Sequence, residues 1–201
     1  MKIFVTADQH FGHANIIRLC DRKTGITVGS RQFEGVHEMN QALTQAYNSV
    51  VGVDDLCYLL GDFCFKNKSG DARTYAATLN GQKVFIEGNH DKGNKLPTRI
   101  RSLTLDHGGV SIGMAHRPEH YNENVDVNLC GHVHGAWTHT WKGENYEHLI
   151  INVGVDVNNY RPMSLDQAVA LAHHVKMVQS SRELREEHVT SQQEVYHGVF
   201  E

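Results

Sequence analysis

Short apolar runs that end in polar residues recur along the chain. Runs of four to eight apolar residues of this kind are typical of buried strands. The runs predict strands over residues 2–7, 55–60, 83–87, 110–115, 125–130 and 149–153. Residues 97–105 do not distinguish a strand from a loop.

Apolar residues at helical spacing predict helices between some of these strands. One helix is expected over residues 37–50, where Met39, Leu43 and Tyr47 fall on one face. A shorter helix is expected over residues 72–79. A third is expected over residues 165–178, with Ser164 as its N-cap.

Strands that alternate with helices predict a layered α/β fold. Little helix separates the later strands, so these strands are either antiparallel or part of a second sheet. We expect one domain over residues 1–178. The tail over residues 179–201 is polar, and it either extends the last helix or is partly disordered.

The composition narrows the classes of function. The 201 residues are 40% hydrophobic and 21% charged, which is typical of a globular protein. A net charge of −4 without a basic run argues against strong binding to duplex nucleic acid, but a small phosphate ester remains a possible ligand. Neither a signal peptide nor a membrane span is recognisable, which predicts a cytoplasmic protein. The cysteines lack CxxC spacing and are expected to be reduced, mostly buried thiols: Cys20, Cys57, Cys64 and Cys130.

Potential metal ligands follow the predicted strands repeatedly. The residues at these positions are Asp8 and His10, Asp62, Asn89 and His90, His116, and His132 and His134. A single polar strand end needs no explanation, but this repetition in a small chain indicates a common site. Gly88 allows the backbone to turn directly before Asn89.

The chemistry of these side chains predicts a particular class of metal. Residues i and i+2 at a strand end point to the same side, so Asp8 and His10 can reach one place, as can His132 and His134. Carboxylate, amide and imidazole ligands without thiolates suit Mn, Fe, Co, Ni or Zn. The candidates are too numerous for one ion, whereas two ions that share a carboxylate would use them all.

The order of these blocks resembles that of the calcineurin-like metallophosphoesterases. The matching blocks are Asp8-x-His10, Gly61-Asp62, Gly88-Asn89-His90-Asp91, His116 and Gly131-His132-x-His134, and Asn152-Val153-Gly154 resembles the closing strand and loop of the family. Phe11-Gly12-His13 and Tyr160-Arg161-Pro162 resemble small bacterial and phage members. The resemblance implies two mixed β-sheets packed face to face with helices outside, a four-layer α/β/β/α sandwich.

The resemblance also implies a role for each residue. Asp8, His10 and His134 would hold the first ion, Asn89, His116 and His132 the second, and Asp62 would bridge the two. A hydroxide between the ions would attack phosphorus. His90 would protonate the leaving oxygen, and Asp91 would orient His90. Mn²⁺ is the preferred ion, with Fe, Ni, Co and Zn as alternatives.

Three functions remain open at this point. The first is a phosphodiesterase that acts on a small or exposed substrate. The second is a phosphomonoesterase, which includes a small protein phosphatase. The third is a catalytically idle metal-binding interaction module, which the complete ligand set disfavours. The sequence does not determine the oligomeric state.

A few polar residues outside the ligand set are candidates for substrate binding. Arg117 adjoins His116 and can hold a phosphate oxygen, although a solvated surface arginine is an equal alternative. His13 and Asn15 are candidates for the cleft wall, with packing or support of a ligand as the alternative for His13. Arg161 is the remaining candidate.

Overall fold

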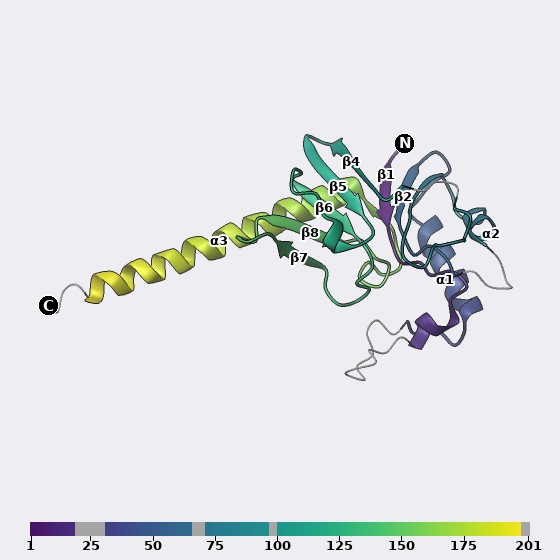
Figure 1. Ribbon diagram of the computed structural model, residues 1–201, viewed down its shortest axis with the longest axis horizontal. Helices are drawn as coiled ribbons and strands as arrows, with labels where there is room; N and C mark the ends of the chain where they lie inside the picture. The colour runs from purple at the N-terminus through teal and green to yellow at the C-terminus, as the bar shows by residue number, and fades with distance from the viewer. Residues whose placement is uncertain (19–30, 66–70, 97–99, 198–201) are drawn as a thin grey trace.

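The first sheet combines three strands from the N-terminal half of the chain with one short strand from the C-terminal half. The computed structural model in Figure 1 describes residues 1–18, 31–65, 71–96 and 100–197. The strands of this sheet are β1 (Ile3–Thr6), β2 (Leu56–Leu60), β3 (Gln82–Ile86) and β9 (Met163–Ser164), in the order β3-β2-β1-β9. Strands β1, β2 and β3 are parallel, and β9 pairs antiparallel with β1. The carboxyl ends of the three parallel strands therefore lie along one edge.

The later strands form a second mixed sheet. They are β4 (Ser102–His107), β5 (Val110–Ala115), β6 (Val127–Cys130), β7 (His139–Lys142) and β8 (His148–Asn152), in the order β4-β5-β6-β8-β7. The inner strands β5, β6 and β8 are parallel, and the two edge strands are antiparallel to their neighbours. Gly108 and Gly109 make the β4–β5 turn with φ of 59° and 79°, values that favour glycine.

Helices flank the two sheets. They are α1 (Val36–Asn48), α2 (Ala72–Ala76) and α3 (Leu165–His197), and the short 3₁₀ helices are η1 (Ala14–Arg18) and η2 (Pro118–His120). Asp71 caps α2, because its carboxylate accepts hydrogen bonds from the backbone N–H groups of Arg73 and Thr74. The far end of α3 projects from the body of the molecule (Figure 1).

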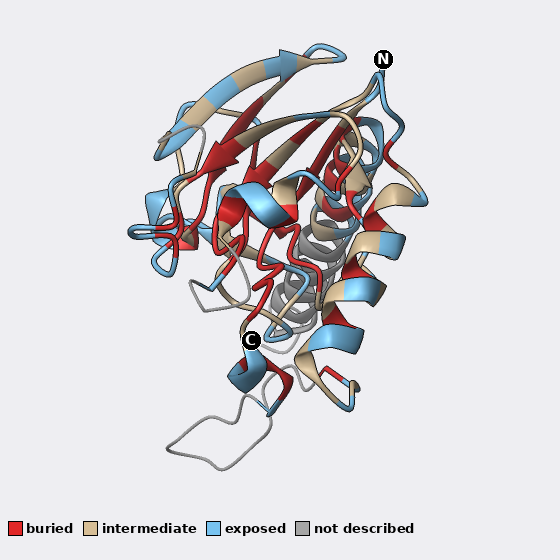
Figure 2. Cartoon of the chain, turned by 90° about the vertical axis from the view of Figure 1, so that its right-hand side faces the viewer, coloured by how far each residue is buried: buried red, intermediate tan, exposed pale blue. Residues whose placement is uncertain are grey.

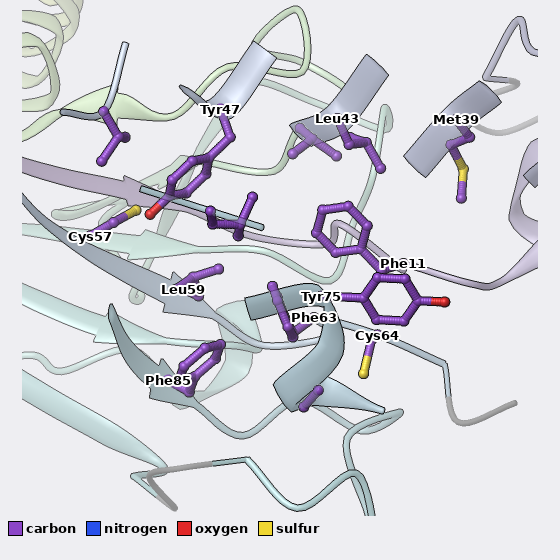
Figure 3. Packing of buried hydrophobic residues seen from close by; sticks show 14 of the residues in the cluster. Phe11, Met39, Leu43, Tyr47, Cys57, Leu59, Phe63, Cys64, Tyr75 and Phe85 are labelled. Atoms are coloured by element: carbon purple, nitrogen blue, oxygen red, sulfur yellow. The ribbon is translucent and has the colours of Figure 1, made fainter. Parts of the chain in front are cut away.

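Two hydrophobic clusters join these layers. The first lies between the first sheet and helices α1 and α2, and Figure 3 shows Leu43 and Tyr47 of α1 above Leu59 and Phe85 of the strands. The second cluster joins both sheets and α3, with Leu60, Ile112 and Leu165 among its members. Successive strand residues such as Leu59 and Leu60 face different clusters, as the alternation of a strand requires. Buried residues accordingly follow the strands, with exposed residues on the outer surfaces of the helices (Figure 2).

The predicted architecture of two packed mixed sheets with helices outside is confirmed. The ambiguous residues 97–105 include the start of β4. The sequence analysis missed β7, a partly exposed edge strand, and β9, which has only two residues. Helix α3 continues into the tail as far as His197, and the domain boundary at residue 178 stays a prediction.

The structure also shows the state of the cysteines and the character of the helices. Cys57, Cys64 and Cys130 are free and buried, as expected, whereas Cys20 lies outside the described residues. In the described ranges, every helix is too short or too polar to cross a membrane.

Candidate metal centre

The candidate ligands meet where the ends of strands from both sheets come together. Within the first sheet, the N–H of His10 donates to the carbonyl of Asp62 at 2.9 Å, which ties the loop after β1 to the loop after β2. Between the sheets, the N–H of His132 donates to Asp8 Oδ2 at 2.8 Å. The ends of β1, β2 and β6 are therefore held together by hydrogen bonds that involve the candidate ligands themselves.

Most of these ligands have a left-handed backbone conformation. The φ angles are 62° at Asp8, 51° at His10, 51° at Asp62, 72° at His132 and 48° at His134. Residues other than glycine rarely adopt positive φ, and such positions cost about 1 to 3 kcal/mol each. Five such residues lie at neighbouring strand ends. This clustering indicates that the surrounding structure holds a strained backbone here, with the side chains directed inward.

The first group of ligands combines Asp8, His10 and His134. One ligand atom from each residue lies within 4.8 Å of the others, which is close enough for one ion. Asp8 and His10 are almost fully buried, at 0% and 1% exposure, whereas His134 is partly exposed.

The second group of ligands combines Asp62, His116 and His132 under the same criterion. Asn89 joins it, because Asn89 Oδ1 lies 3.0 Å from His116 Nε2. His116 Nδ1 lies 2.8 Å from the backbone carbonyl of Leu60, which can only accept a hydrogen bond, so Nδ1 carries the proton. In the neutral ring, Nε2 of His116 is then left with the lone pair that binds metal.

Asp62 lies between the two groups. Its Oδ2 is 3.6 Å from His10 Nε2 in the first group and 3.3 Å from His116 Nε2 in the second. The other oxygen, Oδ1, accepts a hydrogen bond from the backbone N–H of His90 at 2.8 Å. Asp62 thus has the position that a shared carboxylate requires.

The electrostatics of the ligands differ from residue to residue. Burial raises the pKa of Asp8 to about 6, although His134 and His116 oppose the change. Burial also acts to raise the pKa of Asp62, but the hydrogen bond and charge of His116, together with His10, bring it well below its ordinary range. Burial lowers the pKa of His10 and takes that of His132 to about 4, so both rings are neutral near pH 7.

These donors fit divalent ions. Among the residues that the structure describes, the buried His10 Nε2 has no hydrogen-bond partner, and an unpaired buried polar atom is costly unless a ligand satisfies it. Carboxylate, amide and neutral imidazole donors without a thiolate match transition ions of the Mn-to-Zn series. Close packing leaves the ligands little freedom: a Cβ at Gly88 or Gly131 would overlap Asp62 or Asp8.

His90 lies exposed beside the first group. Its ring centre is 5.3 Å from that of His10 and 5.8 Å from that of His13. His13 Nδ1 is 3.1 Å from His10 Nδ1, and the His13 ring stacks on Phe65 at 4.3 Å. His13 therefore supports a ligand of the first group, and Phe65 supports His13.

Asp91 has contacts that the sequence analysis did not anticipate. Its carboxylate accepts hydrogen bonds from the backbone N–H groups of Asp62, Phe63 and Gly88 at 2.7, 3.0 and 2.9 Å. Within the described parts of the chain, no hydrogen bond joins Asp91 to the His90 ring. These contacts favour a role in fixing the loop that carries Asp62 over the expected role in orienting His90.

The remaining candidates divide by location. Arg117 belongs to the centre, since its Nη2 is 3.4 Å from Asn89 Oδ1. Asn15 is exposed in η1, close in sequence to His13. Arg161 lies elsewhere, because it lines a cavity of about 650 Å³ together with Lys2 and Phe4, at the start of β1. Asp8 follows the opposite end of that strand.

The sequence analysis missed Arg31 and Asp156. Arg31 is 2% exposed and pairs with Asp156, which also contacts His134. Burial acts to raise the pKa of Asp156, but the hydrogen bonds from His134 and Arg31 outweigh it and lower the pKa to about 2. Asp156 follows β8 as other site residues follow their strands, a signal that could have identified it. Nothing in the local sequence distinguishes Arg31.

The comparisons with known proteins place the chain among relatives. No family model matches the sequence. An uncharacterized protein of Methanocaldococcus jannaschii is 37% identical over 187 residues, which cover 91% of this chain and 98% of that protein. A protein of unknown function from Aquifex aeolicus has a similar solved structure, with a TM-score of 0.63 and 25% identity over 85% of this chain and 98% of the other.

A more distant solved structure is that of a predicted phosphoesterase from Streptococcus pneumoniae. Its TM-score is 0.40 at 16% identity, over 76% of this chain and 71% of the other. The strand-end blocks occur in the expected order on the expected pair of sheets, and the archaeal relative matches over almost its whole length. The chain therefore belongs to one family with the uncharacterized protein of Methanocaldococcus jannaschii.

Proposed function

We propose that the protein is a two-metal phosphoesterase that hydrolyses phosphodiesters. The observation that carries this proposal is the pair of ligand groups on either side of Asp62, with His90 exposed beside them. Asp8, His10 and His134 would hold one ion, and Asn89, His116 and His132 the other, with Asp62 shared. When bound, such a pair of ions makes a water molecule acidic enough to attack phosphorus and stabilises the entering and leaving oxygens.

The charge of the centre favours a phosphate ester. The carboxylates of Asp8 and Asp62 offset only half of the charge that two divalent ions bring, and the histidine and asparagine ligands are neutral. The excess positive charge lies in a partly buried site, where electrostatic attraction is stronger than in water. Arg117 adds a further cation at the edge and can donate to a phosphate oxygen.

His90 is suited to proton transfer. Its ring is exposed, whereas the backbone N–H of the same residue is fixed on Asp62 at 2.8 Å. A substrate bound over the ligand groups would therefore contact the His90 ring, which is attached to a fixed backbone but remains open to solvent. Donation of a proton to the leaving oxygen is expected to contribute about 10²- to 10⁴-fold to the rate.

Metal reconstitution with paired substrates tests the proposal. Chelated protein is supplied separately with Mn²⁺, Zn²⁺, Co²⁺, Ni²⁺ or Mg²⁺, and hydrolysis of a simple aryl diester and its monoester is measured. Elemental analysis is expected to give two ions per chain. Mn²⁺ is expected to restore diester hydrolysis best, and Mg²⁺ poorly, because Mg²⁺ prefers sites made of oxygen ligands alone.

The possible outcomes separate the candidate functions. Faster hydrolysis of the monoester would make the protein a phosphomonoesterase. Two bound ions without hydrolysis of either ester would support an interaction module. Protein that binds no ion after reconstitution would refute the metal centre itself.

A further inference from the structure

Among the residues whose burial the structure describes, Arg31 is the largest fully buried side chain, and it lies directly behind the first ligand group. Its Nη1 donates to the backbone carbonyl of Gln9 at 2.7 Å, and its Nη2 donates to that of Asp8. The guanidinium therefore binds the turn between Asp8 and His10, which carries two ligands of the first group. It reaches this turn from a different part of the chain, just before α1.

Asp156 connects the same guanidinium to the third ligand of the group. Its Oδ1 accepts from Arg31 Nε at 2.9 Å, and its Oδ2 accepts from Arg31 Nη2 at 3.1 Å. Oδ2 also lies 2.9 Å from His134 Nδ1. The side chain of Asp156 is 4% exposed, so solvent does not compete strongly for these contacts. Both carboxylate oxygens are thus engaged by arginine, and histidine shares Oδ2 with it.

We propose that Arg31 and Asp156 are positioning residues that fix the ring orientation and tautomer of His134 for the first ion. This inference rests on the proposed function, since it concerns how one of the two ions is held. A carboxylate accepts hydrogen bonds, so it selects the His134 tautomer with the proton on Nδ1. Nε2 of that ring then keeps the lone pair for the ion.

Arg31 has a separate part in this arrangement. An isolated buried carboxylate would be costly, and the paired guanidinium fixes both its charge and its rotation. The same guanidinium binds the carbonyls of Asp8 and Gln9, so one side chain sets the spacing between His134 and the Asp8–His10 turn. A lysine provides the charge but not this planar set of donors.

Binding of Co²⁺ alone tests the proposal without any measurement of activity. Wild-type, Asp156→Asn and Arg31→Lys proteins are titrated with Co²⁺, and visible absorption and calorimetry follow each ion. In Asp156→Asn, an NH₂ group replaces one of the two accepting oxygens, so either Arg31 Nε or His134 Nδ1 loses its acceptor and the carboxylate charge is lost in both cases. One ion is expected to bind about 10- to 100-fold more weakly, and the other as in the wild type.

A matched control uses a second histidine–aspartate pair of the chain. His107 Nε2 lies 2.7 Å from Asp166 Oδ1, but the Asp166 side chain is 83% exposed and outside the ligand groups. Asp166→Asn makes the same chemical change and should leave the Co²⁺ titration unchanged.

A double variant shows whether the effect passes through His134. His134→Ala alone is expected to weaken the first ion, and adding Asp156→Asn should weaken it no further, since the ring that Asp156 orients is already gone. A role of Asp156 that merely stabilises the loop would give additive losses and would overturn the proposal.

The wild-type protein offers a test that does not depend on the folding of any variant. In Zn²⁺-loaded protein, long-range ¹H–¹⁵N correlation of the histidine rings reports which nitrogen carries a proton. We expect His134 to be protonated on Nδ1 and bound through Nε2. Binding through Nδ1, or unchanged Co²⁺ affinity in Asp156→Asn, refutes the positioning role but leaves the two-metal proposal standing. Wild-type protein that takes up neither Co²⁺ nor Zn²⁺ overturns both.

Discussion

The two ligand groups are built from the same kinds of residue but are oriented by different means. In the first group, the Asp156 side chain, itself paired with Arg31, faces His134 Nδ1. In the second, the backbone carbonyl of Leu60 faces His116 Nδ1. A backbone carbonyl is fixed by β2 and cannot be removed by substitution, whereas a side chain can. The sheet itself therefore orients His116, whereas the orientation of His134 depends on a buried charge pair that single substitutions can break.

The largest expected effect comes from removing the residue that both groups share. Asp62→Ala should abolish effective binding of both ions and reduce hydrolysis to that of chelated protein, because Asp62 Oδ2 faces His10 and His116. Asp8→Ala should mainly weaken the first ion, because Asp8 belongs to one group. Elemental analysis and calorimetry measure both. Normal metal content and activity in Asp62→Ala would show that the two groups do not share this carboxylate.

Next in size is the effect of removing the proposed acid. His90→Ala should keep both ions, and kcat should fall about 10²- to 10⁴-fold on an alkyl ester, whose basic alkoxide must be protonated. A nitrophenyl ester should lose much less, because nitrophenolate leaves without a proton. The measurement is kcat for both esters, with metal content as the control. Equal losses on both esters, or loss of an ion, would make His90 a ligand or a positioning group.

The charge pair behind the first group should also contribute to stability. Arg31→Met leaves the buried carboxylate of Asp156 and the carbonyls of Asp8 and Gln9 without this partner, so the free energy of unfolding should fall by about 3 to 5 kcal/mol. Arg73→Met, at an exposed position on α2, should change it by only about 0.5 kcal/mol. Urea unfolding of metal-free protein measures both. A small loss of unfolding free energy in Arg31→Met would mean that the first ligand group folds without the Arg31–Asp156 pair.

The candidate ligands could be proposed from the sequence because their signal is local. Asp8, Asp62 and His116 each follow an apolar run directly, so the end of the strand and the ligand can be seen together. The structure brings these residues to the same place because the strand ends converge. Strand β9 was missed because two residues are too few to show the alternation of a strand.

The contacts that orient the candidate ligands could not be predicted, because they join residues that are distant in sequence. Arg31 and Asp156 are 125 positions apart, and their meeting is decided by the packing of the loops. Asp91 shows the same limit over a shorter distance. The family resemblance implied that Asp91 orients His90, but the turn directs the Asp91 carboxylate to the backbone of the loop after β2. The residue types at a strand end can be read from the sequence, whereas the direction in which their side chains point is decided by the fold.

The smallest expected effect concerns the rim of the second group. Arg117 is partly exposed and 3.4 Å from Asn89 Oδ1, so it can hold a phosphate oxygen on that side of the centre. A solvent-exposed charge of this kind contributes about 0.2 to 1 kcal/mol, so Arg117→Met should raise KM by less than about fivefold and leave kcat and both ions unchanged. Arg161→Met is the matched control and should leave KM unchanged, because Arg161 lines the cavity at the start of β1. Steady-state kinetics at low salt measure both. Equal KM values for Arg117→Met and the wild type would show that Arg117 is a solvated surface residue without a role in substrate binding. A raised KM in Arg161→Met would show that the substrate also contacts that cavity.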